Sequence, residues 1–96
     1  MTVLTARVDK KLWENLREIY NEKTLEVPNE IHSSYLVQNT DENDNWQIVT
    51  IWKTEEALQA MRSSGETPTG IQVFKAVNAS PELTVFDIVE NALIIK

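Results

Sequence analysis

Apolar residues recur with two different periods along the first part of this chain. Residues 2–8 alternate imperfectly between apolar and polar side chains and are rich in β-branched types, which predicts a first strand. After Asp9, which can cap a helix, the spacing becomes that of one helical face and predicts a helix reaching to about Lys23. Pro28 marks the exit, because proline disfavours helical geometry in the residue before it. The apolar stripe of this helix consists of Leu12, Trp13, Leu16, Ile19 and Tyr20.

Two further alternating segments predict a β-hairpin. Residues 31–40 and 46–53 read as its strands, and an Asp/Asn-rich turn at 41–45 joins them. Alternation gives the first strand two faces, Ile31, Ser33, Tyr35 and Val37 against His32, Ser34, Leu36 and Gln38. The second strand carries Trp46, Ile48, Thr50 and Trp52 on one face and Gln47, Val49 and Ile51 on the other. Because both of its faces are apolar, we expect helices to cover one and a second copy of the chain to cover the other.

The clearest junction in the chain lies where Trp52 ends this strand. Thr54 is a good N-cap, and Glu55 and Glu56 suit the positive end of a helix dipole, so a helix is predicted to begin here. Gly65 suits the left-handed position just past its end. An indole where a strand meets a helix commonly forms a pocket wall in small α+β domains, so the segment also indicates a ligand site. The inward residues of this helix are Ala57, Leu58 and Met61.

The remaining segments complete a recognisable element order. Thr67 as N-cap and Pro68 as the first helical residue predict a third helix, and residues 83–89 predict a fourth strand. The apolar tail 92–95 is expected to pack on a partner copy or on the sheet edge. The order predicts an α+β, ferredoxin-like split βαβ fold, in which a four-stranded antiparallel sheet carries helices on one face. The apolar positions of the third helix are Ile71, Phe74 and Val77.

Composition narrows the partners and the chemistry. The 96 residues are expected to form one domain, 1–96, whose limited core favours a homodimer. A net charge of −6 without a Lys/Arg cluster argues against nucleic acid as a partner. No apolar run approaches the roughly 18 residues of a membrane helix, so no membrane partner and a soluble, cytoplasmic protein are expected. Without cysteine, and with a single histidine, thiolate catalysis is excluded and no metal site is expected.

The chain resembles the antibiotic biosynthesis monooxygenase superfamily of dimeric α/β-barrel proteins over residues 3–89. The resemblance is carried by the amphipathic first helix, the Pro28 exit and above all the segment 48–61, I-V-T-I-W-K-T-E-E-A-L-Q-A-M. It implies a homodimer whose two sheets face each other, with one pocket per subunit between sheet and helices. Members of the superfamily include cofactor-free oxygenases of quinol or polyketide aromatics, haem-degrading oxygenases and many proteins without an assigned role.

Seven residues are candidates for such a pocket. Trp52 could stack on an aromatic substrate and donate its N–H, although a core role is the alternative. His32, the only histidine, could act as a base toward a phenolic hydroxyl, and its alternative is a structural or exposed position. These two are the catalytic candidates. The residues expected to contact a small hydrophobic or aromatic ligand are Tyr20, Tyr35, Leu58, Met61 and Phe74.

Departures from the superfamily pattern limit the chemistry. Haem-degrading members carry an Asn in strand one, a Trp late in helix two and a later histidine ligand. Ala6 and Met61 stand at the first two positions here, and no histidine follows His32, so haem is not an expected cofactor. The leading hypothesis is a cofactor-independent monooxygenase of a small phenol or hydroquinone. The alternatives are a non-catalytic dimeric module that binds a small apolar molecule, and a structural or regulatory dimer whose cavity is filled by its own side chains.

Overall fold

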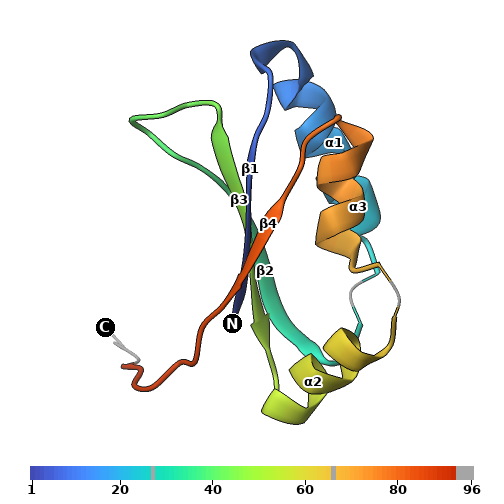
Figure 1. The fold of residues 1–96 in the computed structure, drawn as a ribbon, viewed down its shortest axis with the longest axis vertical. Helices are drawn as coiled ribbons and strands as arrows, with labels where there is room; N and C mark the ends of the chain where they lie inside the picture. The colour runs from blue at the N-terminus through green and yellow to red at the C-terminus, as the bar shows by residue number, and fades with distance from the viewer. Residues whose placement is uncertain (27, 66, 93–96) are drawn as a thin grey trace.

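One antiparallel sheet with helices on one face makes up the computed structural model, which describes residues 1–26, 28–65 and 67–92. Its strands lie in the order β2-β3-β1-β4 (Figure 1). Their bounds are β1 (Thr2–Arg7), β2 (Ile31–Gln38), β3 (Asn45–Trp52) and β4 (Glu82–Val85). The helical elements are the 3₁₀ turn η1 (Lys10–Leu12), α1 (Trp13–Lys23), α2 (Glu55–Ser63) and α3 (Thr69–Ala76). The predicted α+β, ferredoxin-like fold is therefore confirmed.

The core fills the space between the sheet and the packed pair α1 and α3. Leu16 of α1 and Phe74 of α3 are both fully buried in this core. Trp13 meets Trp46 of β3 edge to face, with ring centroids 5.9 Å apart, and its Nε1 donates a hydrogen bond to the carbonyl of Val8. The predicted stripe of the first helix is confirmed, because its other members also pack against this core. Those members are Leu12, Ile19 and Tyr20.

Local capping signals fix the start of η1 and both ends of α2. The Asp9 carboxylate accepts from the N–H of Lys11, and the Thr54 hydroxyl accepts from the N–H of Ala57 at 3.0 Å, as the sequence predicts. Gly65 has φ +76°, the left-handed conformation expected past the end of α2.

The predicted start of the third helix is wrong by one residue. Pro68 occupies the N-cap position with extended backbone angles, and α3 begins at Thr69. No side chain caps this end. Instead, Gln72 reaches back, and its Nε2 donates to the carbonyl of Thr67 at 2.8 Å. This bond ties the first turn of α3 to residue 67, but it does not supply the acceptor for helix N–H groups that was expected of the Thr67 hydroxyl.

A bulge changes the faces predicted for the second strand. Ile31 pairs with Trp52 while Ser33 pairs with Ile51, so the register shifts between Ile31 and Ser33. The extra residue, His32, interrupts the strict alternation. As a result Ile31 joins Ser34 on the helix-covered side and leaves the face of Tyr35, and the strand ends at Gln38 rather than at residue 40.

The fourth strand is shorter than predicted and ends at Val85 rather than at Val89. β4 pairs only with β1, and Val85 lies opposite Thr2. The last bonds of this ladder join the N–H and carbonyl of Phe86 to the carbonyl and amino group of Met1, both at 2.8 Å. Residues 86–92 then leave the sheet on the side away from the helices (Figure 1). The predicted tail packing falls mostly on residues 93–95, which lie outside the described part of the chain.

No described helix covers the second face of the sheet. Val3, Val49 and Tyr35 lie beside one another there on three neighbouring strands. Tyr35 is 52% exposed, while Val49 and Ile51 are partly exposed. This is the apolar face that the sequence predicts to need a further partner.

Arg7 ties the acidic hairpin turn to the end of β1. Its guanidinium donates to Glu42 and to Asp44, each at 2.9 Å. The hydrogen bond to Glu42, followed by the charges of Asp44 and Glu42, raises the pKa of Arg7 above its ordinary value. Across the described residues, no group of three or more His, Cys, Asp or Glu side chains is placed to hold a metal ion. Nor does this part of the chain contain a helix long and apolar enough to cross a membrane.

Candidate functional site

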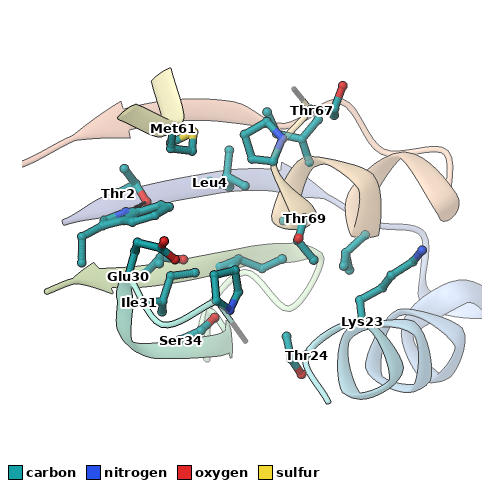
Figure 2. A pocket seen from close by; sticks show the side chains of 18 of the residues that line it. Thr2, Leu4, Lys23, Thr24, Glu30, Ile31, Ser34, Met61, Thr67 and Thr69 are labelled. Carbon is teal, nitrogen blue, oxygen red and sulfur yellow. Dashed lines mark hydrogen bonds between the residues drawn. The ribbon is translucent and has the colours of Figure 1, made fainter. Parts of the chain in front are cut away.

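A cavity of about 360 Å³ lies between the sheet and the helices. Its apolar walls come from β1, β3, α2 and α3, and the end of α1 closes one side. Figure 2 shows Thr2 and Leu4 of β1 between Met61 of α2 on one side and Ile31 and Ser34 of β2 on the other. The cavity size falls at the lower end of the range of sites for small organic ligands. Its main apolar side chains are Leu4, Ile48, Met61, Ile71 and Val73.

Trp52 forms one wall at the end of β3. Its Nε1 donates a hydrogen bond to Oγ1 of Thr2 at 3.1 Å, and Thr2 is only 5% exposed. The register places Ile31 opposite Trp52 on the neighbouring strand. The indole is therefore held in one orientation while part of it remains accessible from the cavity.

Tyr20 lines the cavity from the last turns of α1. Its hydroxyl donates to Oγ of Ser34 on β2 at 2.9 Å. Thr24 closes the helix behind it, because the Thr24 hydroxyl donates to the Tyr20 carbonyl at 2.7 Å. A phenol and a serine hydroxyl thus meet at the wall formed by α1 and β2.

Gly70 lets α3 approach the sheet closely. A Cβ atom at this position would lie 2.6 Å from Cδ1 of Leu4 and 3.5 Å from Cγ2 of Ile48. Both contacted side chains line the cavity. Any side chain at residue 70 would therefore push into the cavity wall.

Four of the predicted site residues do not line this cavity. Leu58 of α2 is buried, and Phe74 of α3 is fully buried in the core. Tyr35 lies on the other face of the sheet. His32 is exposed, with its Nδ1 3.2 Å from Oγ of Ser33, and lines a second hollow of about 350 Å³. A ligand in the main cavity would contact Trp52, Tyr20 and Met61, but not these four.

Sequence reasoning missed the hydroxyl groups of the cavity floor. Thr2, Ser34 and Thr50 all line the cavity. Each is an ordinary strand residue, so the strands' composition carries no signal for them. Strand register is what brings them together, since Thr50 pairs with Thr2 on one side and with Ser34 on the other.

The cavity lining also includes charged side chains. Lys23, Glu26 and Glu30 are exposed residues around the end of α1 and the start of β2. The described lining holds no histidine.

No protein-family model matches the chain, and no curated protein matches it in sequence. Solved structures match it over nearly their whole length. A candidate antibiotic biosynthesis monooxygenase from Deinococcus radiodurans has 12% identity and a TM-score of 0.67, with 100% of each chain covered. A variant of SnoaB, a cofactor-independent oxygenase from Streptomyces nogalater, has 12% identity and a TM-score of 0.67, with 94% of this chain and 93% of that chain covered.

The chain has the fold of the antibiotic biosynthesis monooxygenases. The same fold includes a variant of MhuD with two manganese protoporphyrin IX molecules bound per active site, which has 17% identity and a TM-score of 0.64. That match covers 96% of this chain and 98% of MhuD. At such identities the likeness establishes the fold alone, because one fold hosts different activities. The resemblance read from the segment around Trp52 is confirmed at this level.

Proposed function

We propose that this chain is a cofactor-independent monooxygenase acting on a small phenol or hydroquinone in the cavity beside Trp52. The observation that supports it most is the pairing of an oriented indole with a phenol and hydroxyls in one largely apolar cavity. SnoaB, a cofactor-independent oxygenase, shares the fold. The chemistry that these side chains can support indicates the class of substrate.

The substrate itself supplies the electrons that reduce dioxygen. A phenolate is far more reducing than its phenol, so the protein needs to favour the ionised form and hold it near O₂. Ser34 accepts from the Tyr20 hydroxyl, so its own O–H can donate a hydrogen bond to a phenolate oxygen, which favours the charged form. Trp52 would stack on the ring and keep it in the plane that this contact requires.

The overall reaction balances without a further reductant. A phenolate ring carbon that bears hydrogen, opposite the oxygen in a phenol or beside it in a hydroquinone, forms a bond to O₂, and the resulting peroxide loses its outer oxygen as water when the ring proton leaves. Phenol plus O₂ gives quinone plus water. Met61, Leu4 and Ile48 would exclude bulk water from the reacting ring.

Oxygen uptake with a panel of hydroquinones and polycyclic phenols tests the proposal. Wild-type protein should exceed the autoxidation background. Ser34→Ala should reduce turnover by about 10², the effect of losing one donor to a developing oxyanion. Tyr20→Phe, which removes the hydroxyl that orients Ser34, and Trp52→Phe should also reduce turnover. Tyr35→Phe is the matched control, since the same change on the opposite face should leave uptake unchanged. Uptake that never exceeds the background would refute the proposal.

A non-catalytic binding module is the second candidate. The position of His32 favours it, because the one histidine of the chain lies outside the cavity and no imidazole base faces a bound ligand. In that case aromatic ligands would bind without oxygen uptake. His32→Ala should leave any turnover unchanged under both proposals. A loss of turnover in this variant would show that His32 takes part in the reaction.

A homodimer through the open sheet face belongs to the same proposal. Tyr35 is exposed and Val49 and Ile51 are partly exposed, so this face supplies an apolar surface that a second copy would bury. Light scattering at micromolar concentration should give twice the chain mass. Val49→Glu should shift the protein to monomer, whereas Gln59→Glu, on the exposed side of α2, should not. A wild-type monomer would refute this assembly.

A further inference from the structure

Three hydroxyl side chains form a row across the floor of the cavity. Thr50 on β3 pairs with Thr2 on β1 and with Ser34 on β2. Paired residues of antiparallel strands project to the same side, and neighbouring strands lie about 4.8 Å apart. Because all three residues line the cavity, its floor carries three hydroxyl side chains on neighbouring strands, with their backbones one strand spacing apart.

The two ends of the row are already oriented by hydrogen bonds. Thr2 accepts from the indole N–H of Trp52, and Ser34 accepts from the phenol of Tyr20. A hydroxyl has one donor and two acceptor sites, so each of these residues still has its own O–H to donate. Thr50, between them, makes no side-chain hydrogen bond to any described residue. The row therefore offers three hydroxyl donors to a ligand, and the two at its ends are held in place by Trp52 and Tyr20.

The surroundings of the row define what shape of ligand it suits. Leu4 lies opposite Ile48 on β1 and β3, two residues beyond the pair Thr2 and Thr50 and therefore on the same face of the sheet. A flat hydrocarbon ring would lie on this pair, and its oxygen-bearing edge would then meet the hydroxyls. Two oxygens on alternate ring carbons are separated by close to one strand spacing, whereas oxygens on adjacent carbons lie much closer together.

We propose that the row Thr2, Thr50 and Ser34 is a binding subsite for aromatic ligands with two oxygens on alternate ring carbons, the resorcinol pattern. A ligand with two oxygens can bind either Thr2 and Thr50 or Thr50 and Ser34. Thr50 belongs to both pairs, so we expect it to determine the selectivity for oxygen spacing. Binding at this subsite does not depend on oxygenase activity. Only the identification of the bound ligand as the substrate rests on the proposed function. Oxidation remains balanced for this class, because a 1,3-dihydroxyarene plus O₂ gives a hydroxyquinone plus water.

Calorimetric titration under nitrogen tests the subsite without requiring turnover. The probes are 1,3-dihydroxynaphthalene and 2,3-dihydroxynaphthalene, which differ only in oxygen spacing. Wild-type protein should prefer the 1,3 isomer by roughly fivefold to tenfold, the value of one additional neutral hydrogen bond. Thr50→Val, which keeps the shape of the side chain, should bring the ratio of the two affinities close to one. A ratio is insensitive to any loss of folded protein.

Thr5→Val provides the matched control. Thr5 lies on β1 but on the opposite face, where its hydroxyl accepts from Gln47 at 3.3 Å. This variant should retain the wild-type preference. Equal affinities for the two isomers in wild type, no binding of the 1,3 isomer, or an unchanged ratio in Thr50→Val would each overturn the subsite. Selective binding without oxygen uptake would instead refute the oxygenase proposal and leave the subsite standing.

Discussion

Breaking the hydrogen bond between Trp52 and Thr2 should lower the stability of the fold by a measurable and separable amount. The bond joins Nε1 to Oγ1 at 3.1 Å, and Thr2 is 5% exposed, so water can replace the indole only poorly. A neutral hydrogen bond of this kind contributes about 0.5–1.5 kcal/mol to stability. Trp52→Phe also removes part of a large ring, and Thr2→Val leaves an N–H without its acceptor, so neither single variant isolates the bond.

A double-mutant cycle isolates it. Unfolding free energies of wild type, Trp52→Phe, Thr2→Val and the double variant should show a coupling of about 1 kcal/mol, because the second change has no bond left to remove. In a domain of this size, 1 kcal/mol corresponds to roughly 4–8 °C in Tm. Far-UV circular dichroism in urea is the suitable measurement, since Trp52→Phe alters the fluorescence. All four proteins must be compared at one concentration, because dimerisation would stabilise the folded state.

The refuting result is additivity. If the coupling is smaller than about 0.3 kcal/mol, the two side chains behave as independent sites and the hydrogen bond does not hold the indole. Thr5→Val combined with Trp52→Phe gives the matched comparison, and this pair should be additive because Thr5 lies on the other face of the sheet.

Four further outcomes follow from the structure. Phe74→Ala should cost about 3–5 kcal/mol in urea unfolding, since the ring is 0% exposed, and a loss below about 1 kcal/mol would contradict its place in the core. Thr54→Ala should cost about 1 kcal/mol through loss of the cap on α2, whereas Thr54→Ser should retain most of it. Gly70→Val should weaken binding of naphthalene-sized ligands in calorimetry, because the new side chain enters the wall beside Leu4; unchanged affinity would mean that the ligand lies elsewhere. Haem titration should give no sharp Soret shift, because His32 lies outside the cavity, and stoichiometric haem turnover would contradict this.

Much of the fold could be predicted because its signals are local. The caps at Asp9 and Thr54 act on N–H groups only a few residues away, and the stripe from Leu12 to Tyr20 needs only helical periodicity. The prediction failed at the start of the third helix, where the sequence offers both Thr67 and Pro68 as the first residue of the helix end. At the start of α3, Pro68 rather than Thr67 occupies the N-cap position, and the side chain of Gln72 donates to the Thr67 carbonyl.

Within the site, the sequence by itself determined that Trp52 would stand where a strand meets a helix, because the strand-ending indole and the Thr54 cap are adjacent in the chain. Only the tertiary structure decided which groups share the cavity with it. The bulge at His32 turned Ile31 toward the cavity. Strand register brought Thr2 beside Thr50, and register depends on pairings between distant segments whose energies are summed over the whole sheet.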